Sequence, residues 1–349
     1  MERLNNVIAM ARQAGASDIH ISEGRPLLVR INGRLVQAQF QPEKSRIREI
    51  ILEALDGEQR DRLEAGRDLD FAIATPDGQR QRVNVFRFQG KLAATIRLLN
   101  SYIPSLEELK LPGVLREMAK EPRGLILVTG PTGSGKSTTL ASIIQYINES
   151  RAEHIITVED PIEYVYEDKL SLIHQREVGE DVGSFAGALR SALREDPDVI
   201  LVGEMRDYET ISAAVTAAET GHLVMSTLHT TGAGQTIDRI IDACPVGAQN
   251  QIRTQLSGIL KGIVTQCLIP TADGKGRVAA TEILTGTDAV LNLIRENKCY
   301  QMGSIMQSSS ANGMHTLNWD LCRLVRGGDI SVQSAFKYSN DKKDLEQFL

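Results

Sequence analysis

One stretch limits the possible folds of this chain more than any other. Residues 130–140 read GPTGSGKSTTL and directly follow the apolar run LILVT at 125–129. In a G-x4-G-K-[ST] pattern, the backbone N–H groups of the loop and the N-terminus of the next helix surround a phosphate group. The apolar run, this loop and the helical stretch LASIIQYI at 140–147 therefore predict a strand, a phosphate-binding loop and a helix.

Each residue type in this loop has a physical task. Lys136 reaches the β- and γ-phosphate oxygens of a nucleotide, and the hydroxyl of Ser137 is a direct ligand for Mg²⁺. We therefore expect ATP and Mg²⁺ as cofactors. The nucleotide-binding residues expected in the motif are Gly130, Pro131, Thr132, Gly133, Ser134, Gly135, Lys136, Ser137 and Thr138.

Continuous apolar runs recur through the second part of the chain and alternate with helical stretches. Unbroken apolar strands are typical of a parallel sheet covered by helices on both faces. In such sheets the chemistry collects at the carboxyl ends of the strands. The polar residues after each run are therefore the candidate site, and the runs lie at 125–129, 154–158, 198–203 and 222–228.

The second and third runs end in acids. The second continues into VEDPIE, which places Glu159, Asp160 and Glu163 on the loop beyond the strand. Glu159 and Asp160 are expected to contribute to cofactor binding, and a solvated acidic turn is the alternative. The third ends in Glu204, the first choice for the group that orients or deprotonates the attacking water.

The metal site has an unusual feature. Gly203 stands where such a strand commonly carries an aspartate that helps to hold Mg²⁺. Because Mg²⁺ readily keeps several waters, we expect Ser137 and phosphate oxygens as direct ligands. Glu163 and Glu204 are expected to act on the ion through bound water.

Two histidines, His222 and His229, bracket the fourth run. Their side chains would face opposite ways on an extended strand, so a shared metal is not expected. Both flank a strand that is directed at the nucleotide, so His222 is expected to bind the nucleotide. His229, just past the strand, is placed to sense a γ-phosphate and to pass the signal on to residues 230–241. For an isolated histidine, simple packing is the alternative.

The first hundred residues follow a different pattern. Asn32-Gly33 and Asp77-Gly78 each lie between apolar runs and predict β-hairpins, and residues 44–66 have helical periodicity. Prolines at 99–124 indicate a connecting segment. We expect a small α/β domain at 1–99, a linker at 100–113 and a larger domain at 114–349.

Composition argues against several classes of protein. A net charge of -6, a pI near 5.7 and 4% aromatic residues disfavour direct binding of nucleic acid. The four cysteines are widely spaced and form no zinc motif. No apolar stretch is long enough to span a membrane. The N-terminus predicts a helix with an apolar stripe of Leu4, Val7, Ile8 and Ala11 rather than a signal peptide. We expect a cytoplasmic protein.

The strand ends, in this order, resemble the Walker A, Asp box, Walker B and His box of the secretion ATPase superfamily. The segments closest to its pilus retraction ATPases include SDIHI at 17–21, RVNVF at 82–86, VEDPIE at 158–163 and TGHLVMSTLHTT at 220–231. The resemblance implies a PAS-like N-terminal domain, a RecA-like ATPase domain and a homohexamer with ATP between domains. It also implies that Arg82 and Arg97 reach the nucleotide and act in catalysis beside Glu204, Glu163 and His229.

The function implied by this resemblance is a hexameric ATP-driven motor for type IV pilus retraction. Its expected partner is an inner-membrane platform protein, and its contact with the membrane is expected only through partners. Alternatives are an accessory or pilus-assembly ATPase, a RecA-like nucleic-acid translocase and a non-hydrolysing nucleotide switch. One departure is Leu291, which stands where the retraction signature has an arginine. The C-terminal stretch 314–331 predicts an amphipathic helix that ends at Gly327-Gly328.

Overall fold

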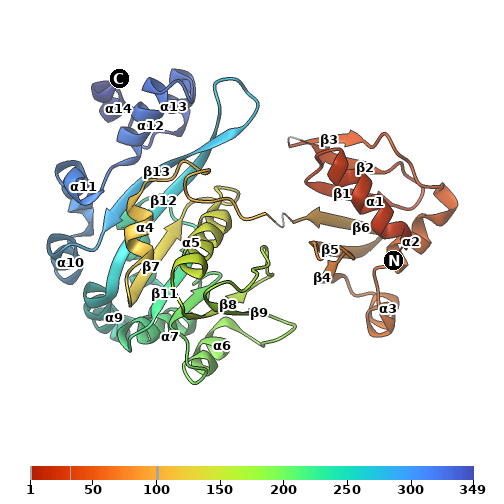
Figure 1. Ribbon diagram of the computed structural model, residues 1–349, viewed down its shortest axis with the longest axis horizontal. Helices are drawn as coiled ribbons and strands as arrows, with labels where there is room; N and C mark the ends of the chain where they lie inside the picture. Colours follow the sequence, from red (N-terminus) through yellow and green to blue (C-terminus); the bar gives the residue numbers. More distant parts are fainter. Residues whose placement is uncertain (1, 32, 100–101) are drawn as a thin grey trace. The chain divides into compact units, whose positions relative to one another are not determined.

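The computed structural model describes residues 2–31, 33–99 and 102–349 and separates into two compact units (Figure 1). Unit 1 comprises Met1–Tyr102 with Glu163–Val165, and unit 2 comprises Ile103–Ile162 with Tyr166–Leu349. The boundaries expected from the sequence stay a prediction, and residues 100–101 of the expected linker lie outside the described residues.

Unit 1 is built on an antiparallel sheet of six strands in the order β3-β2-β1-β6-β5-β4. Both predicted hairpins are confirmed, because β2 pairs with β3 and β4 with β5. Asn32 itself lies outside the described residues. The strands are β1 Asp18–Ser22, β2 Leu28–Ile31, β3 Arg34–Gln37, β4 Leu69–Ala74, β5 Arg80–Phe88 and β6 Lys91–Leu98.

The helices of unit 1 bury their apolar sides against this sheet. Helix α1 (Glu2–Gln13) buries the predicted stripe of Leu4, Val7, Ile8 and Ala11. The helical stretch expected at 44–66 is broken, because Asp56 starts a new helix. Its side chain accepts a hydrogen bond from the N–H of Gln59, whose side chain accepts one in return. The pieces are η1 Lys44–Arg46, α2 Ile47–Leu52 and α3 Gly57–Glu64.

Unit 2 contains a seven-stranded sheet in the order β13-β12-β7-β11-β10-β8-β9. All neighbouring strands are parallel except β12 and β13, so the predicted parallel sheet is confirmed. The predicted runs form β7 Gly124–Thr129, β8 His154–Glu159, β10 Val199–Val202 and β11 Leu223–Leu228. Three further strands join them, β9 Leu172–Glu177, β12 Leu260–Pro270 and β13 Arg277–Thr285.

Helices cover both faces of this sheet. Leu125 and Leu127 of β7 belong to one buried cluster, whereas Ile126 and Val128 belong to the other. A strand that is buried on both faces must be apolar at every position, which explains the unbroken runs. One cluster includes α4 Val114–Ala119 and α5 Lys136–Ser150, and the other includes α6 Phe185–Ala192, α7 Tyr208–Glu219, α8 Ala233–Asp242, α9 Val246–Ile259, α10 Asp288–Arg295, η2 Cys299–Gln301 and α11 Met302–Ser308.

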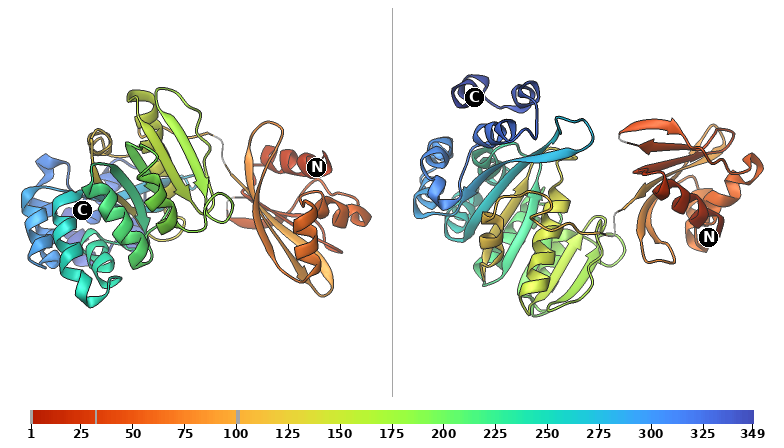
Figure 2. Two further views of the ribbon diagram at one scale, coloured as in Figure 1. Left: turned by 90° about the horizontal axis from the view of Figure 1, so that it is seen from below. Right: turned by 45° about the horizontal axis from the view of Figure 1, so that its top comes forward.

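The C-terminal helices gather beside the β12–β13 hairpin, where they are drawn in blue (Figure 2). The predicted amphipathic helix is confirmed as α12, which ends at its C-cap Gly327. Its apolar side packs against Ile269 and Val278 of the hairpin. The elements of this region are η3 Ser310–Asn312, α12 Leu317–Arg326, α13 Val332–Tyr338 and α14 Lys342–Phe348.

Candidate functional site

The carboxyl ends of β7, β11, β10 and β8 lie at one edge of the unit 2 sheet. These strands are consecutive neighbours and all parallel, so the residues that follow them come together. Lys136, Glu204, His229 and Asp160 all lie in the segments that follow these four strands at this edge. Sequence reasoning had placed the site here.

The phosphate loop connects β7 with α5, whose first residue is Lys136. The Nζ atom of Lys136 donates hydrogen bonds to the carbonyl oxygens of Gly130, at 2.9 Å, and Pro131, at 3.2 Å. The ammonium group therefore lies against the loop and not in the solvent. Gly133 and Gly135 have φ angles of 79° and 89°, which a glycine adopts without strain.

The loop fits a phosphate group. The hydroxyl of Ser134 is buried and, within the described residues, lacks a hydrogen-bond partner. A phosphate oxygen is an acceptor that would satisfy it. Ser137 is exposed at the second position of α5, where its hydroxyl can meet Mg²⁺. Backbone N–H groups at the start of this helix complete the anion site.

Sequence reasoning missed Gln266, a buried residue of β12 that holds the loop in place. Its amide Nε2 donates to the carbonyl oxygen of Ser134 at 2.7 Å, and its Oε1 accepts from the Thr139 hydroxyl of α5 at 2.8 Å. A Cβ atom at Gly130 would lie 2.2 Å from the Gln266 carbonyl oxygen, so only glycine fits there. The apolar run at 260–270 was a signal that could have revealed this strand.

Glu204 and His229 form the centre of the catalytic candidate. His229 Nε2 lies 3.6 Å from one carboxylate oxygen of Glu204, and Arg206 Nε lies 2.6 Å from the other. The Glu204 side chain is 19% exposed, whereas those of His229 and Arg206 are 46% and 71% exposed. The carboxylate is thus fixed between two nitrogen groups at the open edge of the sheet.

Gly203, which stands where an aspartate was expected, lies beside the end of β8. A Cβ atom at this position would already contact Phe185 and the Val158 carbonyl oxygen at 3.4 Å and Glu159 at 3.5 Å. These are ordinary van der Waals distances, so the packing around Gly203 does not by itself require glycine. In the described part of the chain, no three His, Cys, Asp or Glu side chains form a group that could hold a metal ion.

The acids after β8 have separate surroundings. The Oε1 atom of Glu159 accepts hydrogen bonds from the Thr157 hydroxyl, at 2.7 Å, and from the Gln175 amide, at 3.2 Å. Asp160 is exposed directly after the strand. Glu163 is exposed and lies in Glu163–Val165, the segment that groups with unit 1, and its role stays a prediction.

The expectation that His222 binds the nucleotide needs correction. His222 precedes β11, and its carbonyl oxygen accepts from the N–H of Gly124, the first residue of β7. Its Nδ1 atom donates to the carbonyl oxygen of Ala217 at the end of α7. A six-residue strand is about 20 Å long. Within one chain, His222 therefore lies at the opposite edge of the sheet from His229.

Arg82 and Arg97 lie in unit 1, on β5 and β6. Arg82 pairs with Asp70, with its Nη2 2.7 Å from a carboxylate oxygen. Arg97 Nε lies 3.1 Å from Asp18. Both guanidinium groups remain substantially exposed, with side-chain exposures of 39% and 64%. Their reach to a nucleotide stays a prediction.

Residues 1–337 match the family described as type II/IV secretion system protein. The chain belongs to this family. The predicted fold class, a RecA-like P-loop domain with a smaller α/β N-terminal domain, is thereby confirmed. The roles assigned to the residues of the Walker A loop, Asp box, Walker B strand and His box stay predictions.

Named relatives within the secretion ATPase family match most of the chain. A twitching motility protein of Neisseria gonorrhoeae is 48% identical over 320 residues, which cover 91% of this chain and 85% of that protein. The type IV pilus retraction ATPase PilT of Pseudomonas aeruginosa is 46% identical over 333 residues, with coverages of 95% and 96%. A crystal structure of the pilus retraction motor PilT with bound ADP matches with a TM-score of 0.91 and 48% identity, covering 98% of each chain.

Leu291, the departure from the retraction signature, lies on α10. It is partly buried and packs against the apolar cluster that includes Val290 and Ile294. The side chain thus contributes to the core of unit 2.

All four cysteines are free. Across the described ranges 2–31, 33–99 and 102–349, no helix is both long and apolar enough to cross a membrane.

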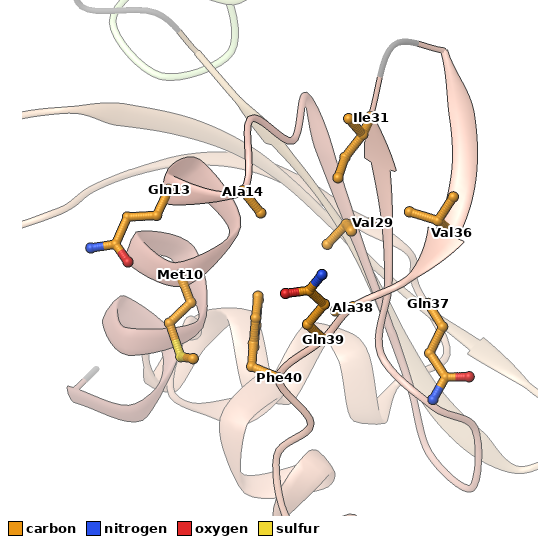
Figure 3. Close-up of a pocket in the computed structure, with 10 residues that line it drawn as sticks. All are labelled: Met10, Gln13, Ala14, Val29, Ile31, Val36, Gln37, Ala38, Gln39 and Phe40. Atoms are coloured by element: carbon orange, nitrogen blue, oxygen red, sulfur yellow. The ribbon is translucent and has the colours of Figure 1, made fainter.

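A pocket of about 550 Å³ lies within unit 1, between α1 and the β2–β3 hairpin (Figure 3). Its lining side chains are apolar or glutamine amides, and none of them, all within the described residues, is charged. A triphosphate requires cationic groups or clustered N–H donors, so this pocket is not the nucleotide site. The lining residues are Met10, Gln13, Ala14, Val29, Ile31, Val36, Gln37, Ala38, Gln39 and Phe40.

Proposed function

We propose that this chain is an ATPase motor that drives retraction of a type IV pilus. The observation that carries the proposal is the meeting of Lys136, Glu204 and His229 at one edge of a parallel sheet. A phosphate loop, a carboxylate and an imidazole are the groups needed to bind and cleave a triphosphate. Similarity to a twitching motility protein and to PilT supports pilus retraction as the use of that reaction.

Binding of ATP depends on the loop and on the start of α5. The N–H groups of residues 130–137 and the Lys136 ammonium take up the phosphates. Lys136 exchanges its hydrogen bonds to the Gly130 and Pro131 carbonyls for phosphate oxygens. Gln266 keeps the loop open by holding Ser134.

Hydrolysis depends on Glu204. A carboxylate held by Arg206 on one oxygen and facing His229 on the other keeps a fixed direction. It orients a water and accepts its proton as the water attacks the γ-phosphorus, which loses its bond to the β,γ-bridging oxygen. His229 lies beside this carboxylate and responds to the presence of the γ-phosphate.

Mg²⁺ is the expected metal, with Ser137 as its direct protein ligand and with Glu163 and Glu204 reached through water. When bound, it neutralises the charge that develops on the phosphate oxygens. The exposed hydroxyl of Ser137 supports this assignment.

The arginines of unit 1 are proposed to complete the reaction. A γ-phosphate gathers charge in the transition state, and a guanidinium that approaches at that moment stabilises it. Arg82 and Arg97 are the candidates. Their resemblance to arginines of the family supports this role, and also supports a homohexamer that works at the cytoplasmic face of the inner membrane on a platform protein.

The test is a deletion in the source cell, complemented with the wild-type gene or with Glu204→Ala. We expect the deletion strain and the Glu204→Ala strain to carry excess, immobile pili, and the wild-type gene to restore surface motility. Purified wild-type protein should hydrolyse ATP, and Glu204→Ala should bind ATP without cleaving it. Absent pili in the deletion strain would indicate assembly, and an inactive wild-type protein would overturn the ATPase.

One observation favours a second candidate, an accessory motor that supports a primary retraction ATPase. Leu291 replaces an arginine of the retraction signature and is packed against the core of unit 2, where it offers no charge. Restoring the arginine with Leu291→Arg separates the two candidates. A gain of pilus retraction by this variant in cells that lack other retraction motors would support the accessory role.

A further inference from the structure

Glu282 of β13 joins the starts of two helices. Its Oε1 atom accepts a hydrogen bond from the N–H of Ala233, the first residue of α8, at 2.8 Å. The same carboxylate accepts one from the N–H of Leu317, the first residue of α12. The N-cap of α8 is Gly232, which has no side chain for this task. Glu282 therefore supplies a cap that the α8 sequence lacks.

Helix α8 begins four residues after His229, so its first turn sets the position of the His229 loop. The loop is tied to this helix by a hydrogen bond of 2.7 Å between the hydroxyls of Thr230 and Thr236. A C-terminal residue, Asn340, adds a contact of 3.4 Å to the carbonyl oxygen of Thr231. Thr231 and Gly232 are also bonded to α8, through the Gln235 side chain and the Thr236 hydroxyl, so the loop and the first turn of the helix move as one piece. Glu282 holds the N–H at the start of that helix.

The support for Glu282 is rigid. Asp320 of α12 is fully buried, and its carboxylate accepts from the N–H of Thr281, at 2.8 Å, and from the Thr281 hydroxyl, at 3.0 Å. Ile283 and His315 exchange backbone hydrogen bonds of 2.9 and 3.2 Å. Strand β13 and α12 are therefore fastened together on both sides of Glu282, and they lie next to each other in Figure 1.

The Glu282 carboxyl group lies in a largely buried setting. Burial raises the pKa of Glu282, although the hydrogen bonds from Ala233 and Leu317 lower it in part. A carboxyl group with a raised pKa in the folded state makes its charged form costly to keep there.

We propose that Glu282 is a positioning residue for the ATPase reaction, which fixes the first turn of α8 and thereby holds His229 opposite Glu204. The inference rests on the proposed function, because it assigns a purpose to the geometry of the same site. In this proposal Glu282 is not a catalytic residue. It acts only through the backbone that carries the imidazole.

The test compares Glu282→Gln with the wild type, with Glu149→Gln as control. Glu149 is an exposed glutamate of α5 that pairs with Lys169, so its variant should match the wild type. For Glu282→Gln we expect kcat to fall roughly tenfold, as for loss of a charged hydrogen bond, with the Kd for ATP unchanged. The melting temperature should be unchanged or higher. A lower melting temperature with unchanged kcat would assign Glu282 a structural role and overturn the proposal.

Two further measurements separate this inference from the proposed function. In a His229→Ala background, Glu282→Gln should reduce kcat less than twofold further, because both changes remove the same alignment; independent losses would overturn the inference. Deuterium uptake should rise in peptides that cover 229–240 and stay constant in those that cover 125–140. If the wild type does not hydrolyse ATP but Glu282→Gln shows this change in uptake, only the proposed ATPase activity is refuted. If the wild type hydrolyses ATP but Glu282→Gln shows no change in uptake, only the role of Glu282 is refuted.

Discussion

Arg82 on β5 and Arg97 on β6 are direct cross-strand partners in the sheet of unit 1. Like charges opposite each other on neighbouring strands normally repel. Here each guanidinium is held by its own carboxylate, Asp70 for Arg82 and Asp18 for Arg97. Two cations are thus kept side by side on one strand pair.

Removal of either arginine should slow ATP hydrolysis with little effect on folding. Arg82→Ala and Arg97→Ala are each expected to lower kcat on the order of 10²-fold or more, because a guanidinium that meets the γ-phosphate in the transition state is lost. The measurement is steady-state ATPase activity with melting temperatures. Arg34→Ala, on the exposed strand β3, is the control. If both variants kept full ATPase activity, Arg82 and Arg97 would be surface residues without a role in hydrolysis.

Lys136→Ala should abolish nucleotide binding and turnover together. Its ammonium is the cation of the phosphate loop, and the Gly130 and Pro131 carbonyls that now accept from it offer nothing to a phosphate. Binding of a fluorescent ATP analogue reports the loss directly. The control is Lys275→Ala, at an exposed residue in the turn after β12. This variant has the same net charge as Lys136→Ala and should bind ATP normally. If Lys136→Ala still bound ATP tightly, the nucleotide site would have to lie elsewhere in the protein.

Glu204→Gln should separate binding from cleavage. The amide keeps the size of the carboxylate but cannot accept a proton from water, so kcat should fall by about 10²-fold or more while ATP still binds. His229→Ala should slow hydrolysis less, roughly tenfold, and uncouple it from pilus movement. Rapid-quench assays with purified variants and motility assays measure the two effects. Loss of ATP binding in Glu204→Gln would refute this division of roles.

Gln266→Met should weaken nucleotide binding although the residue is distant in sequence from the loop. Methionine has a similar volume but leaves the Ser134 carbonyl and the Thr139 hydroxyl without their partners. We expect a Kd for ATP about tenfold higher and a cost in stability of about 1–3 kcal/mol. Calorimetric titration and thermal melts test this. Gln251→Met, exposed on α9, is the control, and equal behaviour of the two variants would deny Gln266 its role.

The difference in stability between Glu282→Gln and the wild type should depend on pH. Because burial raises the pKa of Glu282, the folded state binds a proton more tightly than the unfolded chain. The wild type is thus favoured at low pH, and this contribution is lost as the pH rises through the folded pKa. Glutamine does not titrate. The melting temperature of Glu282→Gln minus that of the wild type should be larger at pH 8 than at pH 5. The same difference at both pH values would contradict a raised pKa of Glu282.

The strands of unit 2 and the phosphate loop could be predicted because their signals are local. An apolar run, a glycine-rich loop and a helix are read within twenty residues of one another. Gln266 could not be found in this way, because its partners Ser134 and Thr139 lie more than a hundred residues earlier and only sheet order brings them together. Glu282 was missed for the same reason, since Ala233 and Leu317 come from different parts of the chain.

His222 shows a different limit. His222 and His229 flank an apolar run that forms a strand, so they lie at the two ends of β11 and therefore at opposite edges of the sheet. Only the direction of β11 decides which of them meets the phosphate loop, and that is His229. Asp56 shows a third limit, since its capping box divides a helical pattern that periodicity alone reads as continuous.

The position of β7 in its sheet also affects when the protein becomes able to bind ATP during synthesis. Gly124–Thr129 pairs with Leu223–Leu228 on one side and with Leu260–Pro270 on the other. A nascent chain that has not reached Leu223 contains the whole phosphate loop but neither neighbour of its strand. Both edges of this apolar strand therefore stay unpaired until β11 and then β12 have been synthesised, and unpaired apolar edges favour aggregation of partly made chains.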